Sequence, residues 1–336
     1  MLPPEYSSFQ EAYVSVLRKA LEDHECRVSP RGNTSREITD TSLRISNPRA
    51  RLAFLEERPV NVVFNLAEVL WYLAGRDDLN MIAYYAPRLS NFSRDGQHLT
   101  GTAYGPKLFG QARDGSSQWS RVRDLLLTDP DTKRATVTFF RPEELTDQAN
   151  PDVSCTVSAQ FLLRDGQLHL SVFMRGNDAY VGMVSDVFAF TFIQEFAAAQ
   201  LGVQLGHYTH HVVSMHVNDR DADHVQRIIK ANSNRDADTV SFPPAAMPSD
   251  ASWEDITTVL QHEAGLRTNE LAHCPSSVAA LDLAPYWQNI ILLFEIYRQI
   301  QHTTGTVSPQ VLNALDPGHR WLVERRWPAR MPGGTQ

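Results

Sequence analysis

A cysteine and an arginine at opposite ends of a predicted hairpin are the first residues whose types and spacing suggest chemistry. Cys155 opens the alternating run CTVSAQFLL, and the run LHLSVFMR ends at Arg175. Asp165-Gly166 between two such runs is a strong β-hairpin signal, so residue 155 should pair near 175–176. A guanidinium beside a thiol favours the nucleophilic thiolate. The pattern indicates an activated cysteine, although by residue type alone a cysteine here is more often an inert small hydrophobe.

Two carboxylates fall inside apolar helical segments. Glu68 belongs to the segment 62–74 and Asp186 to the segment 184–201. A buried charge needs a bonded partner, a proton or a ligand. One interpretation is structural: helix amides satisfy Asp186, and Asn65 or a distant arginine satisfies Glu68. The other is that both carboxylates serve a site.

Four histidines, at 207, 210, 211 and 216, raise the question of a metal site. His210 and His211 are neighbours on a predicted strand and should point to opposite faces, and no Cys or carboxylate pattern completes a zinc site. We therefore expect no metal. The net charge of −8 argues against nonspecific nucleic-acid binding, so a few placed arginines should hold any bound phosphate.

The elements around these residues predict one α+β domain over 1–336, without a repeat or a linker. Apolar periodicity and turn signals predict helices within 1–25 and near 62–74, 117–128, 184–201, 220–231, 253–263 and 279–302, and strands near 135–140, 155–163, 168–175 and 207–217. Residues 76–118 show little periodicity and predict a long functional loop. Three cysteines without CxxC spacing, no leader segment and no apolar run long enough for a bilayer indicate a cytoplasmic protein with no membrane partner.

Several motifs together resemble the thymidylate synthase family. The nucleophile Cys155, the strand ending in Arg175-Gly176-Asn177-Asp178, Gly182, and Ser214-Met215-His216-Val217-Asn218 follow the family's order. Asp129-Pro130-Asp131-Thr132-Lys133-Arg134 is similar to its DPxxRR turn, Glu68-Val69-Leu70-Trp71-Tyr72-Leu73 to its ELLWFL helix, Gly101-Thr102-Ala103-Tyr104-Gly105 to its GPVYG loop, and Arg31-Gly32-Asn33-Thr34 to its RTGT loop. The motif core is 129–220, and an irregular tail is expected from about 317.

The resemblance implies a mixed sheet flanked by helices, a homodimer formed through the sheet, and 5,10-methylenetetrahydrofolate as cosubstrate of a pyrimidine nucleoside monophosphate. The implied roles follow the motifs. Arg31, Arg175 and Gly176 would lie at the phosphate, with Lys133 and Arg134 reaching it from the partner subunit; Asp178, Asn91 and Phe92 would contact the folate and His216 the ribose, while Glu68 and Tyr104 would move protons through water.

The sequence departs from the family at the residue that reads the base. The family's uracil-reading Asn is Asp186 here. An amide can donate to uracil O4 and accept from N3–H, whereas a carboxylate only accepts, which suits the N4 amino group of cytosine and N3 once protonated. The same change marks the deoxycytidylate hydroxymethylases. We therefore expect a cytosine nucleotide.

Two further departures concern the product and the sugar. The loop at about 84–100 lacks the synthases' Trp, with Asn91 and Phe92 near its place, so water could trap the methylene as a hydroxymethyl group. The family's Tyr after the ribose His is Asn218, which could make room for a 2′-hydroxyl. The resemblance then points to a CMP 5-hydroxymethylase like those of nucleoside-antibiotic pathways. A dCMP hydroxymethylase, a thymidylate synthase acting on dUMP, or a noncatalytic folate- or nucleotide-binding regulator are the alternatives.

Overall fold

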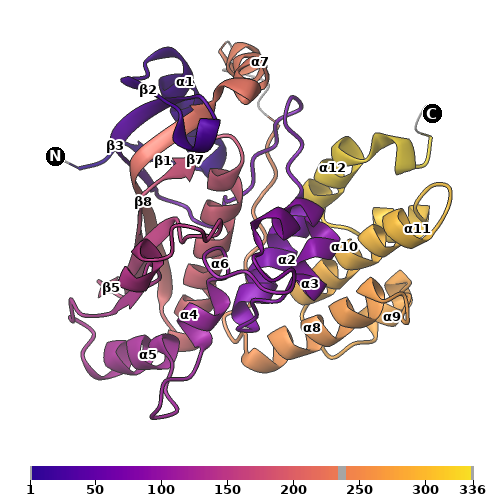
Figure 1. Cartoon of the computed structure of the whole chain (residues 1–336). Coiled ribbons are helices and arrows are strands. Elements are labelled where there is room, and N and C mark those ends of the chain that lie inside the picture. Colours follow the sequence, from indigo (N-terminus) through magenta and orange to yellow (C-terminus); the bar gives the residue numbers. More distant parts are fainter. Residues whose placement is uncertain (1, 234–239, 334–336) are drawn as a thin grey trace.

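An eight-stranded mixed sheet forms one side of the molecule in the computed structural model, which describes residues 2–233 and 240–333 (Figure 1). Along the sheet the strand order is β1-β3-β8-β6-β5-β4, with β2 paired to β3 and β7 to β8. The strands are β1 (Glu5–Tyr6), β2 (Cys26–Val28), β3 (Ser35–Ile45), β4 (Thr136–Thr138), β5 (Thr156–Arg164), β6 (Gln167–Met174), β7 (Asn177–Asp178) and β8 (Gln204–Asn218).

The predicted hairpin is present as β5 and β6, which pair antiparallel from Thr156–Met174 to Arg164–Gln167. Its turn places Asp165 and Gly166 in the left-handed region, which explains the Asp-Gly sequence. Strand β6 then runs parallel to β8, and β8 runs antiparallel to β3. The antiparallel and parallel pairs together confirm the expected mixed sheet.

Helices cover one face of this sheet, and more helices extend away from it. The helix α6 (Gly182–Leu201) packs on β6 and β8, α2 (Val62–Leu73) packs on α6, and α10 (Pro285–His302) packs on α2. In Figure 1 the sheet lies on the left and the C-terminal helices gather on the right, with α6 and α2 between them. The remaining helices are α1 (Phe9–Glu22), α3 (Leu79–Tyr85), α4 (Gly105–Phe109), α5 (Gln118–Thr128), α7 (Ala222–Asn232), α8 (Trp253–Arg267), α9 (Pro275–Ala279), α11 (Pro309–Asn313) and α12 (Pro317–Arg326).

Three sequence predictions about the elements are wrong in whole or in part. Residues 76–118 hold α3, α4 and a 3-10 turn (Pro87–Phe92) rather than one long loop, because these helices are too short for apolar periodicity to be visible. The tail from 317 begins as α12, which starts with Pro317 in its first turn and is capped by Asp316. The helix expected over 279–302 is present as α10, but it begins only at Pro285, and the short α9 ends where it was expected to begin.

The sheet face opposite α6 leaves apolar side chains exposed. Phe173 on β6 is 44% exposed and Val213 on β8 is 39% exposed. Phe173 pairs with His211, which lies two residues before Val213 on β8. The side chains of Phe173, His211 and Val213 therefore point to the same face of the sheet. Within the described ranges, no helix is long and apolar enough to cross a membrane.

Candidate active site

The hairpin brings Arg175 and Cys155 together, as its turn predicts. The backbone amide of Arg175 donates to the carbonyl of Cys155 at 2.9 Å. The guanidinium bonds the carbonyls of Ser154 (2.8 Å) and Val153 (2.9 Å), and its Nη2 lies 3.8 Å from Sγ of Cys155. Cys155 is exposed just before β5, and Arg175 is exposed as well, so a cation stands beside an accessible thiol.

Tyr104 is held next to the cysteine through Thr156. The Thr156 amide and hydroxyl both donate to Oη of Tyr104, at 3.3 and 2.9 Å. Burial raises the pKa of Tyr104 well above its usual value, so the phenol keeps its proton. It can therefore pass a proton only by accepting another, as a relay beside the nucleophile does. This bond is the role that the structure shows for the Thr156 hydroxyl.

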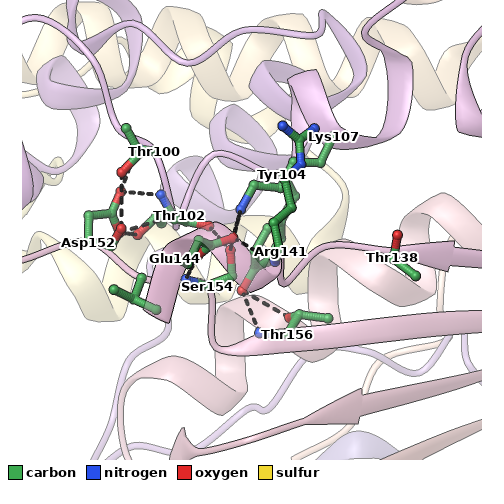
Figure 2. A network of polar contacts seen from close by, with 12 residues as sticks. Thr100, Thr102, Tyr104, Lys107, Thr138, Arg141, Glu144, Asp152, Ser154 and Thr156 are labelled. Atoms are coloured by element: carbon green, nitrogen blue, oxygen red, sulfur yellow. Dashed lines mark hydrogen bonds and ion pairs between the residues drawn. The ribbon is translucent and has the colours of Figure 1, made fainter. Parts of the chain in front are cut away.

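Asp152 fixes the loop that carries Tyr104 to the turn that carries Cys155 (Figure 2). Its carboxylate accepts the backbone amides of Thr100, Gly101 and Thr102 at 2.8–2.9 Å. Gly101 also approaches the Asp152 backbone so closely that a Cβ would lie 2.5 Å from its carbonyl oxygen. The loop glycine is therefore required by close packing.

A buried ion pair, which no sequence pattern predicts, lies directly behind the nucleophile. Nζ of Lys107 bonds Oε1 of Glu144 at 2.9 Å and also contacts Oγ of Ser154. The other Glu144 oxygen accepts the Ser154 amide at 2.7 Å (Figure 2). The residue next to Cys155 is thus tied at both its amide and its hydroxyl.

Glu68 lies buried on α2 with its proton retained. Burial, and secondarily the charge of Asp186, raise its pKa to about 8, opposed by a hydrogen bond from Tyr72. Asn65 does not satisfy Glu68, because its side-chain oxygen meets the Ser185 hydroxyl at 3.2 Å. The structural interpretation through Asn65 is therefore wrong.

Asp186 is a partly buried carboxyl on α6, and its partner is a side chain rather than the helix amides. Nδ2 of Asn177 donates to Oδ2 of Asp186 at 2.8 Å. Burial raises the pKa of Asp186 to about 7. Because the charge of Asp186 also raises the pKa of Glu68, the two carboxyls titrate as a coupled pair. The two carboxyls form a pair whose proton count changes near neutrality.

Strands β7 and β8 place the predicted folate and sugar residues side by side. Asp178 and His216 are register partners. Asp178 accepts the amides of Tyr180 and Val181, and its Oδ2 accepts Nδ2 of Asn218 at 2.7 Å. The side chain of Asn218 is therefore directed by Asp178, which the sequence did not predict. A Cβ at Gly176 would make an ordinary van der Waals contact with Ser214, 3.6 Å from its carbonyl oxygen.

Other predicted site residues lie on exposed segments whose roles stay predictions. Lys133 and Arg134 are exposed in the turn between α5 and β4, and Asn91 and Phe92 are exposed in the turn Pro87–Phe92. Arg31 lies in the 3-10 turn Pro30–Gly32, and its side chain is outside what the structure describes.

A large cavity of about 800 Å³ lies away from these residues. It is lined by the start of α1, residues 49–54 and 241–246, and parts of α10 and α12. Glu195 forms ion pairs with Arg49 and Arg51, two of the residues that line it. We place the chemistry at Cys155, where nucleophile, cation and titrating carboxyls meet.

Comparison with known proteins identifies the family of this chain. The model of the thymidylate synthase family matches residues 11–262. A deoxyuridylate hydroxymethyltransferase of Bacillus phage SP01 is 32% identical over 219 residues, which are 62% of this chain and 56% of the phage protein. One from Delftia phage PhiW-14 is 28% identical over 213 residues, 60% of this chain and 58% of that protein. A putative thymidylate synthase of Methanothermobacter marburgensis is 24% identical over 220 residues, 66% and 94% of the two chains.

The match to the two phage proteins thus spans little more than half of their length. The family match runs from α1 into α8 and contains every predicted site residue, whereas α9–α12 lie beyond it. Family members use methylenetetrahydrofolate as cosubstrate and modify C5 of a pyrimidine nucleotide. By this match and by its mixed α+β fold, the chain belongs to the thymidylate synthase family.

Proposed function

We propose that this protein is a folate-dependent 5-hydroxymethylase of a cytosine nucleotide, with CMP as the substrate. The observation that carries the proposal is Asp186, a carboxyl with a pKa of about 7 where the family resemblance places a uracil-reading amide. Relatives named deoxyuridylate hydroxymethyltransferases support the hydroxymethyl product. The choice of cytosine rests on Asp186 alone.

Recognition of the base depends on which of its atoms gains negative charge when the thiolate adds to C6. Addition of a thiolate to C6 makes N3 of cytosine basic, and Asp186 can give its proton to N3 while accepting from the N4 amino group. The same addition to uracil puts negative charge on O4, where an ionised Asp186 offers no donor. The mismatch costs on the order of a few kcal/mol.

The remaining steps of the proposed reaction use side chains that lie around Cys155. The thiolate, favoured by Arg175, forms a C–S bond at C6, and C5 then forms a bond to the one-carbon unit. Loss of the C5 proton toward Tyr104 and water near Glu68 leaves an exocyclic methylene as tetrahydrofolate departs. Water adds to that methylene, the C–S bond breaks, and the C5–C6 double bond returns. Cys155 leaves as the thiolate, so no redox change occurs.

Methylenetetrahydrofolate would supply the one-carbon unit, and Asp178 is chemically suited to hold its pterin. Two backbone amides and Asn218 fix the Asp178 carboxylate as an acceptor. A pterin ring presents N–H donors that match a fixed carboxylate. Asn91 and Phe92, exposed in their turn, would close over the ring without a Trp to exclude water.

We further propose a homodimer formed through the sheet. Phe173 and Val213 leave apolar surface on the face opposite α6, which a second sheet would bury. Lys133 and Arg134, exposed beyond α5, would then contribute to the partner's phosphate site together with its Arg31 and Arg175.

A substitution at Asp186 tests the choice of base. We expect Asp186→Asn to shift the ratio of kcat/KM for CMP over UMP toward UMP by at least about a hundredfold. Glu68→Gln is the matched control, because it removes the neighbouring titratable group without touching the base, and it should slow both substrates alike. Unchanged cytosine preference in Asp186→Asn would refute the proposed readout.

A further inference from the structure

Three hydrogen bonds in series connect the interior of the sheet to Asp186. Oη of Tyr208 lies 2.8 Å from Nδ1 of His210, and Nε2 of His210 lies 3.1 Å from Oδ1 of Asn177. Nδ2 of Asn177 then donates to Asp186 at 2.8 Å. Tyr208 and His210 are fully buried on β8, and Asn177 is 4% exposed on β7. The row therefore lies behind the carboxyl, away from solvent.

The chemistry of Asp186 sets the direction of every bond in this row. An ionised carboxylate only accepts, so Asn177 must present its Nδ2 to it and its Oδ1 to His210. That oxygen needs a donor, which places the His210 proton on Nε2. Nδ1 is then an acceptor for the Tyr208 hydroxyl. Burial lowers the pKa of His210 to about 3, so the ring is neutral, as this pattern requires.

Gly182 closes the remaining side of the Asn177–Asp186 bond. A Cβ at Gly182 would lie 3.1 Å from Nδ2 of Asn177 and 3.5 Å from Oδ2 of Asp186. The first turn of α6 thus stands directly against the bonded pair. The side-chain amide of Asn177 is enclosed by the first turn of α6, the Asp186 carboxyl and the His210 ring, so only one orientation of its oxygen and nitrogen fits.

We propose that His210 is a positioning residue for base recognition, which acts by fixing the orientation of the Asn177 amide. With Oδ1 of Asn177 held by His210, Nδ2 engages Oδ2 of Asp186. The other Asp186 oxygen remains for the base. The assignment of cytosine as that base rests on the proposed function, whereas the effect of His210 on the carboxyl does not.

Loss of the His210 donor has a predictable effect on Asp186 itself. The bond from Asn177 lowers the pKa of Asp186 against the effect of burial. The other titratable groups that face this carboxyl are Glu68, Tyr72, Tyr104 and Tyr208, and replacing His210 leaves them in place. Releasing the Asn177 amide should therefore raise the protonation midpoint of Asp186.

Titration of the nucleotide-free protein tests this proposal without relying on turnover. The Asp186 carboxyl carbon would be followed by ¹³C NMR in Asp-labelled protein, with its signal assigned by loss in Asp186→Asn. His210→Phe removes the Nε2–H donor and keeps a flat ring, and His210→Gln restores an N–H donor. His319→Phe is the matched control, since His319 is a half-buried ring that also bonds an asparagine, Asn289.

We expect His210→Phe to raise the Asp186 midpoint by about half to one pH unit, and His210→Gln and His319→Phe to leave it near the wild-type value. In the same variants the CMP over UMP ratio of kcat/KM should fall about tenfold for His210→Phe only. An unchanged midpoint in a folded His210→Phe, or an equal shift in His319→Phe, would overturn the proposal. A wild-type protein with no cytosine preference would instead refute the proposed function, and the titration would still decide the role of His210.

Discussion

Nη2 of Arg175 lies 3.8 Å from Sγ of Cys155, while two other bonds of the same guanidinium go to the carbonyls of Ser154 and Val153. The arginine thus shapes the turn that presents the thiol and also supplies the positive charge beside it. This dual role makes the reactivity of Cys155 dependent on Arg175 even before a nucleotide phosphate arrives.

Replacing this charge should slow alkylation of the thiol. We expect Arg175→Gln to react with iodoacetamide about tenfold more slowly than wild type near neutral pH, because less thiolate forms without the cation. The measurement is the rate of Cys155 modification followed by peptide mass spectrometry. Cys26 and Cys274, which are also exposed, serve as internal controls and should keep their rates. Equal slowing of all three would point to a change in the whole fold rather than in the local charge.

The buried carboxyl Glu68 should make stability depend on pH. Its pKa rises from 4.5 when exposed to about 8 in the folded protein, so the folded state binds more protons between these values. Stability must therefore fall as pH rises through this window. Glu68→Gln should remove part of this fall and be more stable than wild type at pH 8 by on the order of 3 kcal/mol, with a smaller difference at pH 5. Urea unfolding at both pH values measures it, and a stability gap that does not change with pH would contradict the account.

The ion pair behind the nucleophile gives a test of positioning. Lys107→Met leaves Glu144 buried without its cation and should cost on the order of 3 kcal/mol of stability. The double variant Lys107→Met/Glu144→Gln removes the charge as well and should recover part of that loss. Thermal unfolding compares the three proteins. A single variant as stable as wild type would show that Ser154 and Cys155 are held by other contacts.

Asn218 and Asp178 link the sugar and folate sides of the site. Because Nδ2 of Asn218 is bonded to Asp178, its Oδ1 is the atom that could accept from a 2′-hydroxyl. We expect Asn218→Tyr to lower the kcat/KM ratio of CMP over dCMP about tenfold, since a phenol refills the space for the hydroxyl. dCMP is the control substrate within each protein. A ratio unchanged by the substitution would remove Asn218 from sugar selection.

The sequence predicted the parts of the site that depend on local pattern and failed where side chains meet across the fold. The Asp-Gly turn and strand alternation were enough to pair Cys155 with Arg175. The partner of Asp186 was not predictable, because Asn177 reaches it from β7 through tertiary packing. Tyr72, in contrast, stands one turn after Glu68 on α2, and this i, i+4 spacing was a signal in the sequence. Asn177 belongs to the Gly176-Asn177-Asp178 motif. Its place there was a signal for a role in the site, but that role was not predicted.

The buried Lys107–Glu144 pair illustrates the same limit. Lys and Glu are residue types that usually lie at the solvent-exposed surface. These two are buried only because α4 packs against the residues before β5. The helices α3 and α4 were missed because one or two turns give too few residues for apolar periodicity to be visible. Long elements such as α2 and α6 were predicted nearly to their ends.

The measurement that tests the central claim most directly is mass spectrometry of the products formed from CMP, dCMP and dUMP in competition, with the protein and methylenetetrahydrofolate. The account predicts that CMP gains a CH₂O unit while tetrahydrofolate is released. The same gain on dCMP alone would support base recognition by Asp186 and water capture of the methylene, and it would contradict the role of Asn218 in sugar selection. A CH₂ gain on dUMP with release of dihydrofolate would contradict the account, because Asp186 would then be reading uracil and the methylene would be reduced instead of trapped by water.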